Sequence, residues 1–233
     1  MEFGSDIAVE TPQGLRPEAP SRFERREAQV ARILEGARIC FLKSGFQGAS
    51  MGDICAAAGM SPGALYRYFP SKESLIEAIC AADKESDAKI LRQMVNAPSI
   101  VDGMTTGLLA HAEQVHASGM APLFAEIYAE AMRNPAMKQI LDDSMCEVTE
   151  VIGAALNDAV LRGEIDPVLP LEQLMPIMMA MGHGLVTEDL PRMGIPIQTM
   201  EPAVRAMIVG MLRPRLQHIP LIQSHEVQKT LVT

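Results

Sequence analysis

The chain has no tryptophan, and aromatic residues make up only 4% of its 233 residues. Long apolar runs are missing as well, since none reaches the ~18 residues that a membrane-spanning helix needs. No signal peptide precedes the first helical stretch. These absences predict a cytoplasmic protein that has no membrane partner.

Signatures of several enzyme classes are also missing. The sequence has no H-E-x-x-H, no Walker loop and no G-x-G-x-x-G after a strand. Glu126 and Glu130 are four positions apart on an expected helix, but two acids on one helix face are more often solvated than catalytic. An enzyme is therefore the disfavoured class, and no cofactor is expected.

The four cysteines contain no C-x-x-C pair. Cys40, Cys55, Cys80 and Cys146 each lie in an apolar helical stretch, which favours buried reduced thiols over disulfides or metal ligands. His111 and His116 are five positions apart and do not share a helix face, so a two-histidine metal site is not expected.

Charge is unevenly distributed along the chain. The formal net charge is −9, but residues 22–73 contain eight Lys or Arg and five acids, a net charge of +3. A small basic segment on an acidic body indicates a DNA-binding unit attached to a unit that does not bind DNA.

Residues that favour helix dominate what is present. Ala, Leu, Met, Glu and Arg recur at helical spacing, which predicts an all-α fold of about nine helices. The expected helices span 22–43, 50–58, 61–69, 72–96, 100–117, 121–133, 136–162, 171–188 and 200–213. The expected domains are a disordered arm (1–21), a helix-turn-helix domain (22–73), a ligand-binding and dimerisation domain (74–216) and a tail (217–233).

The run 58–75, AGMSPGALYRYFPSKESL, predicts the second helix of a helix-turn-helix unit. Leu65 and Phe69 are four apart and should hold this helix to the unit. The remaining positions are then left for the major groove, with Arg67 as the candidate for reading guanine. The expected DNA-binding residues are Ser50, Met51, Pro62, Gly63, Ala64, Tyr66, Arg67, Tyr68 and Lys72.

The stretch from about residue 32 to 78 resembles the N-terminal domain of the TetR family of bacterial transcriptional repressors. The resemblance is carried by Ser50-Met51-Gly52-Asp53-Ile54-Cys55 and by the long run from Ala58 to Glu73. It implies a homodimer that binds a pseudo-palindromic double-stranded DNA operator. It also implies a C-terminal domain whose small-molecule ligand releases the protein from DNA.

The C-terminal half is rich in methionine, which is typical of adaptable apolar pockets but also of ordinary cores. We expect a hydrophobic small-molecule ligand, and the resemblance implies control of a multidrug efflux system. The expected pocket residues are Met94, Leu108, His111, Phe124, Tyr128, Met145, Thr149, Ile152, Met175 and Met179. His111 can equally be a core histidine.

Two glycines in the expected helix 171–188 indicate close helix contact, because glycine costs a helix ~1 kcal/mol relative to alanine. The resemblance implies that the last two long helices form the dimer interface. The expected contacts are Gly182, Gly184, Leu185, Val204, Met207, Ile208 and Met211. The alternative for function is a DNA-binding regulator without an inducer, switched by a protein partner or by cysteine oxidation.

Overall fold

A computed structural model describes residues 21–82 and 84–215 of the chain. Its elements are α1 (Arg22–Gly48), α2 (Met51–Ala57), α3 (Pro62–Leu65), α4 (Lys72–Ala82), α5 (Lys84–Val95), α6 (Ile100–Ala117), α7 (Ala121–Ala131), α8 (Pro135–Leu161), α9 (Leu171–Thr187), the 3-10 helix η1 (Ile197–Met200) and α10 (Glu201–Leu212). The described ranges contain no strand, and one isolated bridge joins Ile165 to Pro214. The predicted all-α class is confirmed.

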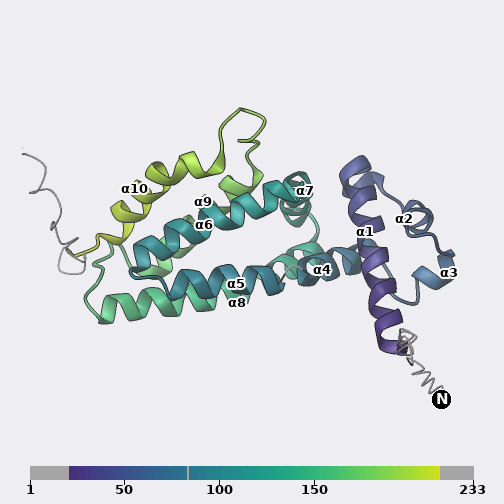
Figure 1. The fold of residues 1–233 in the computed structure, drawn as a ribbon, viewed down its shortest axis with the longest axis horizontal. Helices are drawn as coiled ribbons and strands as arrows, with labels where there is room; N and C mark the ends of the chain where they lie inside the picture. The colour runs from purple at the N-terminus through teal and green to yellow at the C-terminus, as the bar shows by residue number, and fades with distance from the viewer. Residues whose placement is uncertain (1–20, 83, 216–233) are drawn as a thin grey trace, which may run out of the picture.

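The first three helices form a separate unit at one end of the molecule, which we call the head (Figure 1). Its core is built by the helical period of α1, which places Ile33, Ala37 and Phe41 on one face with no more than 1% exposure. Ile54 of α2 and Leu65 of α3 are fully buried as well. The head is thus held by apolar positions at helical spacing, among them Leu65, for which the sequence predicts this role.

Helices α4 to α10 form the elongated remainder, which we call the body (Figure 1). Helix α6 contacts α5, α9 and α10, while α7 contacts α8 and α9 and also reaches α1 of the head. Gly103 permits the close approach of α5 to α6, since a Cβ there would lie 2.0 Å from the carbonyl oxygen of Met94. The body therefore meets the head through both α4 and α7.

Two details differ from the sequence-based expectation. The helix expected for 72–96 is described as α4 and α5, which lie on either side of residue 83, outside the described residues. Helix α3 is one turn long, because after Leu65 the chain continues in turns that lead to Pro70. Helix α1 runs three residues past Gly45, where it is broken. The expected arm, apart from Ser21, and the expected tail lie outside the described residues.

No helix in the described part of the chain combines the length and apolarity that crossing a bilayer requires.

Candidate DNA-binding surface and ligand cavity

Helix α3 and the turn after it present a largely exposed surface. Leu65 is fully buried and Phe69 is 8% exposed, so both hold this segment to the head as predicted. Pro62, Gly63 and Arg67 are exposed, and Tyr66 is 52% exposed. A Cβ at Gly63 would meet no described atom within 4 Å. The packing of the protomer therefore gives no reason for glycine at this position.

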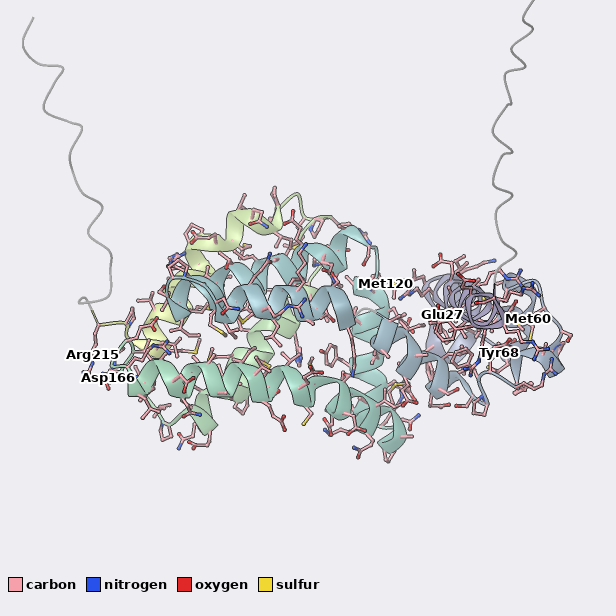
Figure 2. All side chains as sticks on the ribbon, turned by 60° about the horizontal axis from the view of Figure 1, so that its bottom comes forward. Glu27, Met60, Tyr68, Met120, Asp166 and Arg215 are labelled. Atoms are coloured by element: carbon pink, nitrogen blue, oxygen red, sulfur yellow. The ribbon has the colours of Figure 1, made fainter. Side chains whose placement is uncertain are left out.

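Figure 2 shows how far this surface lies from the opposite end of the body. Met60 and Tyr68 lie in the head, whereas Asp166 and Arg215 lie at the far end of the body. Met120 lies at the end of the body that faces the head.

Three of the expected DNA-binding residues also have structural partners within the head. The Ser50 hydroxyl accepts a hydrogen bond from the Asp53 backbone N–H at 3.1 Å and donates to the Asp53 carboxylate at 2.6 Å. The bond from the Ser50 hydroxyl, with a second one from the Ser50 backbone N–H at 3.0 Å, lowers the pKa of the Asp53 carboxylate below its usual range. Met51 and Tyr68 are half-buried and pack against the core, while Ala64 is half-buried. Contact of these residues with DNA stays a prediction.

Lys72 also has a structural role. Its ammonium donates to the carbonyl oxygen of Phe46 at 2.6 Å and lies 4.6 Å from the centre of the Phe46 ring. Lys72 therefore ties the start of α4 to the end of α1. A contact with phosphate, as the sequence predicts, would have to share this ammonium.

The turn between α2 and α3 has the spacing G-x-S-x-G, from Gly59 to Gly63. In hydrolases this spacing places a nucleophilic serine on a turn from a strand to a helix. Here the turn joins two helices, and Ser61 is the residue that precedes the first helical position of α3. The structural context of a hydrolase nucleophile is therefore missing at this position.

A cavity of about 150 Å³ lies inside the body. Its walls come from α4 to α9 and are mostly apolar. The lining residues are Cys80, Asp87, Ile90, Leu91, Met94, Gly107, Leu108, His111, Phe124, Ile127, Tyr128, Leu141, Ser144, Met145, Val148, Ile152, Met179, Gly182, His183 and Val186. It has the volume of an engineered cavity that binds benzene, which is about 150 Å³.

Eight of the ten expected pocket residues line this cavity. The two exceptions are Thr149 and Met175. The Thr149 hydroxyl donates to the Met145 carbonyl oxygen of its own helix at 2.9 Å, and Met175 packs against the core one turn before the wall formed by Met179. The prediction misses the lining face of α8 by one position at Thr149, since Met145, Val148 and Ile152 of the same helix all line the cavity.

The most informative wall residue that was not predicted is His183 on α9. Its ring lies 4.3 Å from the ring of Tyr128, measured between centroids. The His183 Nε2 is buried and has no hydrogen-bond partner among the described residues. The sequence held a signal, because His183 is four positions after Met179 on the same helix face.

The polar groups deep in the cavity are held in their neutral forms. Burial raises the pKa of the Tyr128 hydroxyl well above its usual range, with a smaller contribution from the charge of Cys80. Burial also lowers the pKa of His183, and the nearby His111 lowers it further. At neutral pH the inner wall therefore carries a phenol and an uncharged imidazole.

A second hollow, of about 470 Å³, lies between α1 of the head and helices α5 to α7 of the body. Asp87, His111 and Phe124 border both this cleft and the cavity. Asp87 is 3.5 Å from His111 Nδ1 and accepts a hydrogen bond from Gln114 at 3.4 Å. These polar contacts stand between the cavity and the junction of head and body.

Two glutamates of α7 bind the end of α1. Glu126 accepts a hydrogen bond from the Phe46 backbone N–H at 2.5 Å, and Glu130 accepts one from the Gln47 side chain at 2.9 Å. Glu130 is only 4% exposed. The bond from Gln47, with a further one from Arg133, lowers its pKa below the usual range. The expectation of a solvated acid is therefore wrong for Glu130, whereas Glu126 is exposed and bonds to the head as well.

Gly45 makes this contact possible. Its φ of 73° belongs to the left-handed region, which breaks α1 and turns the N–H of Phe46 toward α7. A Cβ at Gly45 would also lie 2.9 Å from Oε1 of Glu126. Both the backbone angle and the short distance thus require glycine at the junction.

The expected dimer contacts divide into two groups. Leu185 is 8% exposed, and Val204 and Ile208 are fully buried in the protomer. A Cβ on Gly182 would lie 3.1 Å from Leu108. These four residues pack inside the protomer, so their assignment to the interface is corrected. Met207 is 46% exposed, Met211 is half-buried, and a Cβ on Gly184 would meet no described atom within 4 Å.

The cysteines are likewise divided. Cys40 and Cys55 are buried as predicted, and Cys80 is half-buried in the cavity wall. Cys146 is exposed on the outer side of α8, where its thiol lies 3.5 Å from Glu150, so the expectation of burial is wrong for this residue.

Comparison with known proteins gives consistent matches. Residues 33–79 match the family model described as bacterial regulatory proteins, tetR family. The HTH-type transcriptional regulator UidR of Escherichia coli K12 is 34% identical over 192 residues, which cover 80% of this chain and 95% of UidR. The HTH-type transcriptional repressor AcnR of Corynebacterium glutamicum is 26% identical over 155 residues, 66% of this chain and 78% of AcnR. The structure of Salmonella enterica GusR aligns with a TM-score of 0.70 and 32% identity, over 80% of this chain and 96% of GusR.

Proposed function

The chain belongs to the TetR family of bacterial regulatory proteins, and we propose that it is a repressor that a small molecule in the body cavity releases from DNA. As a member of this family, it is a DNA-binding transcriptional regulator and not an enzyme. The observation that carries the proposal is the position of α7, which lines the cavity with Phe124 and Tyr128 and binds the head through Glu126.

DNA binding is assigned to the exposed side of α3 and the turn after it. In helix-turn-helix proteins the second short helix enters the major groove with its N-terminal residues first. Pro62, Gly63 and Ala64 would then lie close to the bases, with Arg67 as the side chain that reaches guanine. Tyr66, Tyr68 and Lys72 would contact phosphates and fix the position of the head.

Binding as a homodimer requires a surface that the protomer leaves open. Helices α9 and α10 each offer one: Ile177 is 60% exposed and Met207 is 46% exposed. Side chains at Gly184 and Gly210 would meet no described atom within 4 Å, so a second subunit can approach both helices closely. We place the interface on these outward faces, with the two heads about 34 Å apart on successive major grooves.

The release step follows from the two roles of α7. A ligand that displaces Phe124 or Tyr128 moves a helix whose opposite side holds the backbone of Phe46 and the side chain of Gln47. Cys80 of α4 also lines the cavity, and Lys72 of the same helix holds Phe46. Helices α4 and α7 both join the body to the head, and each also contributes side chains to the cavity wall.

The cavity volume bears on the range of ligands. Pockets for drug-sized compounds usually measure about 300–1,000 Å³, which is larger than the about 150 Å³ found here. The proposed ligand is therefore a single small compound, in contrast to the broad apolar range expected from the methionine content. Control of an efflux system stays a prediction.

The experiment is a titration of the full-length protein onto the DNA upstream of its own gene, followed by a panel of apolar compounds. Release by small apolar compounds, with no effect of thiol oxidants, supports the proposal. Release by thiol oxidants alone would replace it with redox control. Tight DNA binding that neither group disturbs would point to a protein partner.

A further inference from the structure

The chemical class of the ligand can be deduced from the cavity walls, and this inference rests on the proposed function. Most of the lining is formed by Leu, Ile, Val, Met and Phe side chains, so most of the ligand surface must be apolar. A volume of about 150 Å³ accommodates one six-membered ring, as in the engineered cavity that binds benzene.

One atom of the wall requires a polar partner. The His183 Nε2 has less than 1 Å² of accessible surface and no hydrogen-bond partner among the described residues. Buried polar atoms in native proteins are nearly always hydrogen-bonded. The nitrogen is covered in the structure, and a ligand that displaces the neighbouring Tyr128 ring, as in the release step, would supply the missing partner. His116, by contrast, has its Nε2 satisfied by the Leu185 carbonyl oxygen at 2.9 Å.

The surroundings of His183 favour a flat and uncharged partner. Its ring lies 4.3 Å from that of Tyr128 at an interplanar angle of 42°, and Phe124 lines the same cavity. Aromatic rings in such positions favour a planar ligand. A neutral imidazole nitrogen either donates or accepts one hydrogen bond, as a hydroxyl does, whereas a buried carboxylate needs a cationic partner.

The one carboxylate among the lining residues, Asp87, lies at the side of the cavity toward the head. Asp87 and His111 pair with each other there at 3.5 Å, and both also border the cleft toward the head. A ligand with a full charge would have to leave its charge in that polar region, away from His183.

We propose that the cavity binds a neutral compound with a single ring and a hydroxyl group, a simple phenol in chemical terms, and that His183 recognises the hydroxyl. His183 is then the residue that determines specificity, while the apolar walls supply most of the contact. Tyr128 and Phe124 provide the faces against which the ring packs.

The test is calorimetric titration of the full-length protein with phenol, toluene and benzoate. The expected result is that phenol binds about five- to tenfold more tightly than toluene, which corresponds to one net hydrogen bond, and that benzoate binds more weakly than phenol. If the unmodified protein binds phenol and toluene equally, or prefers benzoate, the inference is overturned without any variant.

A variant then locates the recognition. His183→Phe keeps a ring beside Tyr128 and should abolish the preference for phenol over toluene while toluene still binds. Tyr128→Phe is the matched control, since it removes a hydroxyl from the same wall and should keep the preference. A preference that survives in His183→Phe would contradict the role of His183.

The outcome is separable from that of the proposed function. If phenol binds as described but leaves the protein on its operator, the ligand class stands and release by ligand fails. If other compounds release the DNA and no single-ring hydroxy compound binds, release by ligand stands and the ligand class fails.

Discussion

The head and the body place their functional residues in opposite ways along the chain. The proposed DNA-reading surface comes from one run, residues 62–68, on a single short helix and the turn after it. The cavity takes its walls from six helices, and its lining residues span positions 80 to 186. A local string therefore defines the first site, whereas the relative rotation of several helices defines the second.

The largest expected effect separates the two regions by matched core substitutions. Leu65 in the head and Leu156 in the body are both fully buried. Leu65→Ala and Leu156→Ala should each lower the free energy of unfolding by about 3 kcal/mol, because each leaves a cavity. Denaturant unfolding measures this loss. Leu65→Ala should also abolish operator binding while small-molecule binding to the body persists, and loss of both functions together would contradict the separation.

Base reading by the head gives the next effect. Arg67→Ala should weaken binding to the operator by about 1–3 kcal/mol and relax the preference at one base position, because a bidentate contact with guanine is lost. Fluorescence anisotropy on specific and random DNA measures it. Arg192→Ala, an exposed arginine of the body, is the control and should change neither affinity. Equal losses on both DNAs would mean that Arg67 only positions the head.

The third effect concerns the contact between head and body, and we expect it to be smaller than the two effects above. Glu126→Ala removes the acceptor for the Phe46 N–H and should reduce the effect of ligand on operator affinity severalfold, with ligand affinity itself unchanged. Anisotropy with and without phenol measures the coupling. Glu147→Ala, at an exposed position of α8, is the control. If the effect of ligand on operator affinity is unchanged in Glu126→Ala, the contact of α7 with the head does not transmit ligand binding.

The smallest effect concerns pH. Burial lowers the pKa of His183 in the folded state below its ordinary value of about 6.5, so the unfolded chain binds more protons as the pH falls through that value. Stability should be fully present above about pH 6.5 and decline below it toward the folded pKa. Thermal melts from pH 7.5 to 5.5 should show a smaller decline for His183→Phe than for the unmodified protein. If both proteins lose the same thermal stability over this pH range, groups other than His183 cause the decline.

Prediction from the sequence succeeded where neighbouring residues share a role. The helical period of α1 and the spacing of Leu65 and Phe69 place the core of the head, because packing within one short unit follows from periodicity. The same reasoning found eight cavity residues, including Phe124 and Tyr128, since their helix faces are apolar.

Prediction from the sequence failed where contacts depend on elements that are distant along the chain. Glu126 and Glu130 look like solvated acids until α7 lies against the end of α1, more than 80 positions away in the case of Glu130. Gly182 and Gly184 look equivalent in sequence, yet Gly182 faces Leu108 and Gly184 faces open space. Val204 and Ile208 carry the pattern of an interface helix, but the protomer itself buries them.

The most direct test of the account is the operator affinity of the full-length protein with the cavity filled. Calorimetry first establishes the phenol concentration that saturates the protein, and anisotropy then compares operator binding with and without phenol at that concentration. We expect the operator affinity to fall by about tenfold or more, within the usual range of allosteric coupling. An operator affinity that stays the same while phenol fills the cavity would contradict it.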